Sequence, residues 1–119
     1  MFKLDLAKLS VLDGFIAAAL VDLTSGTTLA TYGNGFDLEL AAAGNTEVVN
    51  CKLEVMQALK LDDQIEDILI TLVSQYHLIR LLESSNDLFL YLVLERSGSN
   101  LAFARHILKA LEEDILDFS

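Results

Sequence analysis

The stretch that decides the fold is FIAAALVDLTSGTTLATYG, residues 15–33. An unbroken apolar run from Phe15 to Val21 opens it, far shorter than the ~20 residues that a helix needs to span a bilayer. A short loop with a glycine able to take a positive φ, Thr24–Gly26, follows, and then residues 27–32, whose Thr and Tyr suit a pleated surface. The stretch therefore predicts two antiparallel strands joined by a hairpin, the first strand buried on both faces.

The rest of the chain continues this pattern of strands and helices. Helical spacing of the apolar residues predicts helices over 2–13 (ended by Gly14), 37–60 (N-capped by Asp37) and 100–115 (N-capped by Asn100). Further strands are predicted over 65–73, 76–82 and 88–94. The last strand, LFLYLVL, is apolar at every position, which is typical of a strand covered on both faces. The predicted class is α+β: a five-stranded antiparallel sheet in the order α-β-β-α-β-β-β-α, with helices on both faces.

Composition narrows the classes of partner. The 119 residues suffice for one core, so we expect residues 1–119 to form a single domain. A net charge of −10 disfavours binding to nucleic acid and to anionic lipid. The N-terminus does not resemble a secretory signal and the single Cys51 forms no internal disulfide, so we expect a cytoplasmic protein. The mean hydropathy of +0.45 is high for a small chain and indicates that a second chain covers part of its surface.

The long predicted helix carries two apolar stripes when it is drawn as a wheel at ~100° per residue. One stripe holds Leu38, Ala42, Val49, Leu53 and Met56. The second stripe holds Ala41, Val48, Val55 and Leu59. A helix that lies on one sheet needs only one stripe. The second is therefore covered either by another helix of the same chain or by the same helix of a second copy in a two-fold dimer.

Residues with recognisable chemistry are sparse. His77 and His106 have no second His or Cys at ligand spacing, so we predict no zinc site and interpret both as surface or half-buried structural residues. Cys51 lacks a C-x-x-C partner and is predicted to be a small, semi-buried residue. No nucleophile motif and no phosphate-binding loop is present, so we predict no catalytic residue and no cofactor.

Two groups of charged residues leave alternatives open. The acidic run of Asp62, Asp63, Glu66 and Asp67 lacks the ligand alternation of a calcium loop. It is a solvated lead-in to a strand, a patch for a basic partner or, third in rank, a cation site. Arg80 lies among apolar neighbours, which favours a structural ion pair; an arginine finger supplied by Arg80, Arg96 or Arg105 is the alternative.

Three strings, taken in order and spacing, resemble the Roadblock family of the dynein light-chain type over roughly residues 4–115. AALVDLTSGTTLATYG resembles that family's first hairpin through Val21, Asp22 and Gly26. YHLIRLL, residues 76–82, resembles its fourth strand, although Leu81 stands where proline is frequent. SNLAFARHIL resembles the Asn-Leu-x-x-Ala-Arg opening of its last helix, matched by Asn100, Leu101, Ala104 and Arg105.

The resemblance implies a long helix on one face of the sheet and both terminal helices on the other. It also implies pairing with a second copy or a paralogous subunit, in which the third strands meet edge to edge and the long helices pack together. The candidate interface residues are then Ala41, Val48, Val55, Leu59, Ile68 and Ile70. Family members are non-catalytic modules, and some bind and regulate Ras-like small GTPases.

We therefore expect a dimeric adaptor that regulates a small GTPase. The first alternative is a scaffold subunit of a larger complex with no GTPase partner. A third hypothesis, an enzyme or a small-ligand sensor, lacks a supporting motif in the sequence. The acidic composition favours a protein partner with a basic face, and such binding weakens with salt.

Overall fold

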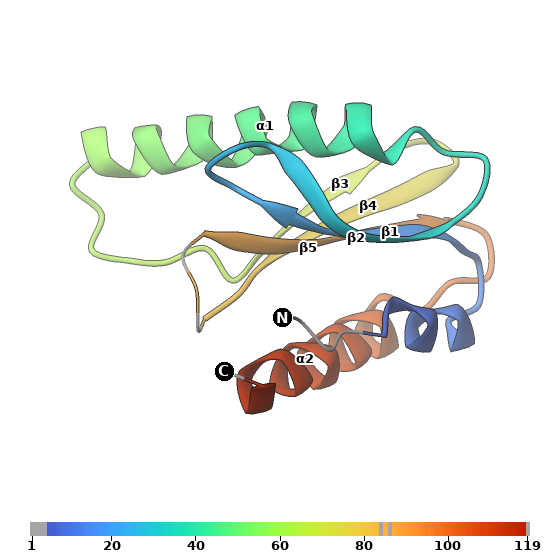
Figure 1. The fold of residues 1–119 in the computed structure, drawn as a ribbon. Helices are drawn as coiled ribbons and strands as arrows, with labels where there is room; N and C mark the ends of the chain where they lie inside the picture. The colour runs from blue at the N-terminus through green and yellow to red at the C-terminus, as the bar shows by residue number, and fades with distance from the viewer. Residues whose placement is uncertain (1–4, 84, 86, 119) are drawn as a thin grey trace.

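A five-stranded antiparallel sheet separates one long helix from two other helices in the computed structural model, which describes residues 5–83, 85 and 87–118 (Figure 1). The strands are β1 (Phe15–Asp22), β2 (Thr27–Gly33), β3 (Asp67–Thr71), β4 (Gln75–Leu81) and β5 (Leu88–Glu95), and their order in the sheet is β2-β1-β5-β4-β3. The helices are the 3-10 helix η1 (Leu6–Val11), α1 (Leu38–Ala58) and α2 (Leu101–Phe118). Helix α1 lies on one face of the sheet, and η1 and α2 lie on the other.

The predicted class, element order and placement of helices are confirmed. Strand β5 is buried from Leu88 to Leu94 and β1 from Ala17 to Val21, so both central strands are covered on both faces as their apolar runs predict. Gly26 takes a φ of +73° in the β1–β2 turn, which is the backbone conformation expected there.

The first helix is shorter than predicted. The prediction covered residues 2–13, of which 2–4 lie outside the described residues, and the observed element is a six-residue 3-10 helix. Asp5 caps its start by accepting a hydrogen bond from the Ala7 N–H, and Leu12 is already extended. Gly14 follows with a φ of +80°, and a Cβ at this position would lie 2.8 Å from the Glu95 carbonyl oxygen. The helix has therefore already ended before Gly14, and Gly14 instead allows the chain to pass close to β5.

Two apolar cores hold the layers together. Leucines dominate the core between the sheet and α2, with Leu9, Leu92 and Leu108 fully buried. The core under α1 combines small side chains, including Ala17, Ala19 and Val49, with the buried rings of Phe89 and Tyr91. Each fully buried Leu or Val contributes about 1.5–3 kcal/mol, so these cores fix which side of each helix faces the sheet.

The two long helices begin where their caps predict. Asp37 Oδ1 accepts a hydrogen bond of 3.0 Å from the Leu40 N–H, and Asn100 Oδ1 accepts one of 3.0 Å from the Phe103 N–H. Of the first apolar stripe of α1, Leu53 is half-buried and the other members are buried against the sheet. The orientation of α1 therefore follows from its sequence, and the second stripe points elsewhere.

Candidate interaction surface

The second apolar stripe of α1 is exposed. Val48, Val55 and Leu59 are 40%, 42% and 62% exposed, and Ala41 is half-buried. The terminal helices η1 and α2 lie on the opposite face of the sheet and do not reach this side of α1 (Figure 1). Cover of the stripe by another helix of the same chain is therefore wrong for the described part of the molecule.

Further small and apolar residues widen this stripe into a continuous face. We define the outer apolar face of α1 as Leu40, Ala41, Gly44, Val48, Cys51, Val55, Ala58 and Leu59. The predicted semi-burial of Cys51 is wrong: it is exposed, because its sector of the helix points away from the sheet. A Cβ built on Gly44 meets nothing within 4 Å, so this position is open to close approach by another helix.

The two edges of the sheet differ in their readiness to pair. Strand β2 carries a β-bulge: Ala30 pairs with Leu20 and Thr28 pairs with Val21, so Leu29 is an extra residue that interrupts the edge. Strand β3 pairs with β4 without a break from Asp67 to Thr71. It contains no Lys, Pro or Gly, and its one charged residue is held by an arginine of α2. Strand β3 is therefore the open edge of this sheet.

A groove joins this open edge to the outer apolar face. Its volume is about 570 Å³. Its lining residues are Val48, Lys52, Met56, Leu61, Gln64, Ile65, Glu66, Asp67 and Ile68. We call it the α1–β3 groove. The helix face, the groove and the strand edge together form one candidate interaction surface.

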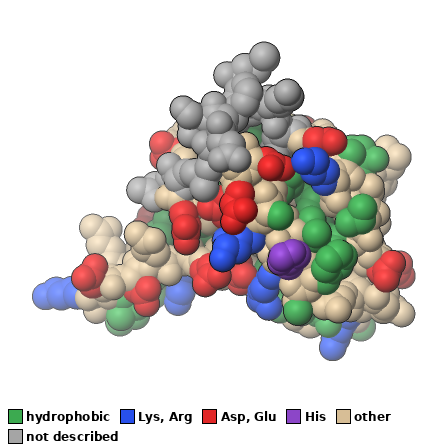
Figure 2. Space-filling view, turned by 90° about the horizontal axis from the view of Figure 1, so that it is seen from below, with side chains coloured by type: hydrophobic (Ala, Val, Ile, Leu, Met, Phe, Trp, Pro, Cys, Tyr) green, Lys and Arg blue, Asp and Glu red, His purple; other side chains and the backbone are tan. Residues whose placement is uncertain are grey.

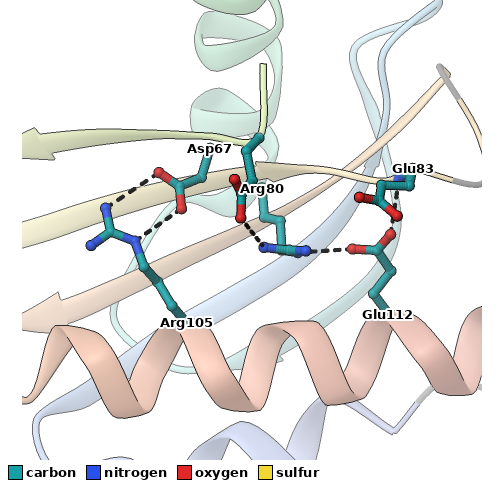
Figure 3. A network of polar contacts seen from close by, with 6 residues as sticks. Asp67, Arg80, Glu83, Arg105 and Glu112 are labelled. Atoms are coloured by element: carbon teal, nitrogen blue, oxygen red, sulfur yellow. Dashed lines mark hydrogen bonds and ion pairs between the residues drawn. The ribbon is translucent and has the colours of Figure 1, made fainter. Parts of the chain in front are cut away.

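Ion pairs on the opposite side of the sheet fix β3 and β4 to α2 (Figure 3). Arg105 donates two hydrogen bonds to Asp67, of 2.9 and 3.3 Å, and this pairing raises the pKa of Arg105. Arg80 and Glu112 are both buried, with Arg80 Nε 2.8 Å from Glu112 Oε1. The second oxygen of Glu112 accepts the backbone N–H of Glu83 at 2.8 Å. The predicted structural ion pair of Arg80 is confirmed.

The arginines and two members of the acidic run, Glu66 and Asp67, take part in contacts within the chain. Arg96 lies over the ring of Tyr76, 5.7 Å from its centroid. Glu66 faces Arg80 across 3.9 Å, whereas Asp62 and Asp63 are exposed. Among the described residues, no three His, Cys, Asp or Glu side chains gather as metal ligands would.

His77 is half-buried under the N-terminal half of α1, one of the two placements predicted for it. Its Nδ1 is 2.9 Å from the Tyr91 hydroxyl and its Nε2 is 2.9 Å from Gln75 Oε1. The ring of Phe36 meets that of His77 edge-on at 5.7 Å. Burial lowers the pKa of His77 and raises the pKa of Tyr91 to about 12, so both side chains are neutral near pH 7. His106 is exposed on α2.

The α2 side of the molecule has a different surface character. Figure 2 shows positive, negative and apolar side chains interleaved over the described part of this face. A groove of about 320 Å³ lies between η1 and α2, next to an exposed ion pair of 3.0 Å between Lys8 and Asp114. None of the helices, over the residues that the structure describes, combines the length and apolarity needed to cross a membrane.

The five-stranded sheet, with the long helix on one face and the terminal helices on the other, is the fold of the Roadblock family. Several solved structures share it. The Roadblock/LC7 domain from Streptomyces avermitilis superimposes with a TM-score of 0.81 at 12% identity, covering 94% of this chain and 91% of that chain. MglB from Myxococcus xanthus gives a TM-score of 0.76 at 12% identity, with coverages of 95% and 94%. An MglB described as having a tetrameric arrangement gives 0.72 at 15% identity, with coverages of 94% and 85%.

Comparisons of sequence alone find no such relatives: no family model matches the chain, and no curated protein matches it. At identities of 12–15%, the structural likeness establishes the fold.

Proposed function

We propose that this protein is a non-catalytic, dimeric adaptor that binds and regulates a Ras-like small GTPase. The observation that carries the proposal is the outer apolar face of α1, which lies beside the open edge of β3 and which no described element of the chain covers. The resemblance to the Roadblock family supports the GTPase partner. A scaffold subunit that pairs with a copy or a paralogous subunit, and binds no GTPase, remains the alternative.

Two-fold pairing would bury the same apolar face of both copies in one contact. Val48 is close to the middle of α1, so an antiparallel pair of α1 helices brings the Val48 side chains of both copies near the symmetry axis. Gly44 and Cys51, one turn to either side, are small enough for the helices to approach closely. Apolar burial at ~25 cal/mol per Å² then drives association against its entropic cost.

The dimer is tested by placing a charge in the proposed contact between the two α1 helices. Val48→Glu and Val55→Glu are expected to convert the parent dimer to a monomer in sedimentation velocity, because each buries a carboxylate without a partner. Asn50→Glu is the matched control: it adds the same charge on the polar side of α1, where Asn50 is exposed, and should leave the dimer intact. A Val48→Glu variant that sediments like the parent would contradict the proposed interface.

The GTPase partner is tested separately. Tagged protein is used to capture Ras-like proteins from the source cells in the presence of GDP or GTP analogues. A recovered GTPase is then assayed for GTP hydrolysis with and without this protein, which distinguishes an activator from a passive binder. Capture of no GTPase in either nucleotide state would favour the scaffold alternative.

A further inference from the structure

The hairpin between β3 and β4 ends in an exposed apolar tip. Val73 is 95% exposed, and its neighbour Leu72 is also exposed. The tip is nevertheless well held: the Leu72 N–H donates to the Gln75 carbonyl at 2.8 Å, and the Arg96 N–H donates to the Ser74 carbonyl at 2.9 Å. Arg96 Nη1 also donates to the Leu72 carbonyl at 3.3 Å. The tip therefore presents its apolar side chains in a fixed position.

Strand pairing predicts where the tip of a second copy comes to lie. When β3 pairs antiparallel with its copy around Leu69, residues equally far from Leu69 on either side stand opposite each other. Ile68 then faces the second copy's Ile70. Continued outward, the same register brings the second copy's Leu72 opposite Glu66 and its Val73 opposite Ile65.

Those two positions line the α1–β3 groove. Side chains alternate along a strand, so Leu72 points to the same side of the sheet as Ile68 and Ile70. Ile68 packs into the core under α1, which places Leu72 on the groove side.

We propose that Leu72 of each copy inserts into the α1–β3 groove of the other. This inference rests on the dimer of the proposed function and adds a reciprocal lock at both ends of the β3 pair. The groove supplies apolar contacts from Met56, Leu61 and Ile65, and its volume of about 570 Å³ accommodates a branched aliphatic side chain. The lock fixes the strand register, because sliding by several residues removes the tip from the groove.

Cross-linking tests the contact directly. Two single-cysteine proteins, Leu61→Cys and Val73→Cys, each in a Cys51→Ala background, are mixed, allowed to exchange subunits and treated with a short bismaleimide. A covalent product joining position 61 of one chain to position 73 of the other, identified by peptide mass spectrometry, is expected. A matched mixture of Leu61→Cys with Val11→Cys, an exposed position on η1, should give no such product.

A binding measurement provides the second test. Leu72→Asp is expected to raise the dimer dissociation constant at least about tenfold, because a carboxylate enters an apolar groove. Val11→Asp adds the same charge on η1 and should not change it. Urea unfolding of Leu72→Asp in the Val48→Glu background, which should be monomeric, distinguishes a weakened dimer from a destabilised chain.

The outcomes separate the two proposals. A parent protein that sediments as a monomer overturns the dimer. A parent dimer that Val48→Glu dissociates, but that keeps its affinity in Leu72→Asp and gives no 61–73 product, overturns the inserted tip and leaves the dimer standing.

Discussion

At the scale of single residues, His77 couples the ionisation of an imidazole to the packing under α1. The amide oxygen Gln75 Oε1 is an acceptor, so Nε2 carries the ring proton and Nδ1 accepts from the Tyr91 hydroxyl. This tautomer satisfies both ring nitrogens without a charge. Burial lowers the pKa of His77 below its usual 6.5, so the folded state binds a proton less readily than the unfolded chain.

Stability should therefore fall as the pH drops through the usual histidine pKa of about 6.5, where the unfolded chain takes up a proton that the folded chain excludes. We expect His77→Gln, which keeps a polar side chain but does not titrate, to flatten the pH dependence of the unfolding free energy between about pH 5 and 7. Urea denaturation across that range measures it, with His106→Gln, at an exposed site, as the control. An unchanged slope in His77→Gln would assign the titration to other groups.

The buried ion pair between Arg80 of β4 and Glu112 of α2 joins the sheet to this helix. Glu112→Ala should destabilise the protein by about 3–5 kcal/mol, because Arg80 then keeps a buried charge without its Nε acceptor. Replacing both residues with Met should cost clearly less than that single change. Asp114→Ala, which breaks the exposed ion pair with Lys8, should cost less than about 1 kcal/mol in the same urea titrations. Equal losses from the buried and the exposed pair would contradict this account.

At the scale of elements, the periodicity of apolar residues predicts a helix or strand correctly where that element packs mainly against one other part of the fold. The unbroken apolar runs of β1 and β5 and the capped starts of α1 and α2 are all found as predicted. The predicted strand over 65–73 is longer than the observed Asp67–Thr71. Apolar residues at Ile65, Leu72 and Val73 look like strand residues in sequence, because composition does not distinguish a strand from the apolar tip and groove at its ends.

The interaction surface is only partly predictable for the same reason. The wheel finds Val48 and Val55, because they form a stripe, but not the groove, which needs Leu61 and Ile65 from a different segment. It also misplaces Cys51, because a helical wheel gives the angle of each side chain around the helix but does not show which angles the sheet covers. The candidate residues Ile68 and Ile70 are half-buried on the edge strand, and their role in pairing stays a prediction.

Gly44 provides a test at the level of the helix. A Gly inside an exposed helix costs roughly 1 kcal/mol relative to Ala, and a Cβ at this position meets nothing within 4 Å. In a Val48→Glu background, which should be monomeric, Gly44→Ala is expected to raise the unfolding free energy by about 0.5–1 kcal/mol in urea. In the parent, Gly44→Leu is expected to weaken the dimer, because the larger side chain holds the two α1 helices apart. A parent dimer unaffected by Gly44→Leu would place the helix contact elsewhere.

At the scale of the whole molecule, the negative net charge opposes the association of two copies and favours the binding of a partner with a basic face. Each copy carries a net charge of −10, so two copies repel each other at long range. Salt screens this repulsion over a Debye length of ~10 Å at 0.1 M. We expect the dimer dissociation constant to decrease as NaCl rises from about 0.05 to 0.5 M in sedimentation equilibrium. Binding of a partner with a basic face should weaken over the same range, and an identical salt response of both associations would contradict this assignment.

The interrupted edge of β2 bears on how strand pairing between copies ends. In the proposed dimer, pairing through β3 leaves two β2 strands, each interrupted at Leu29, as the outer margins of the joined sheet. A third copy would find no straight row of free amides on which to continue. We therefore expect growth through strand pairing to stop at the closed pair and not to proceed to a fibre.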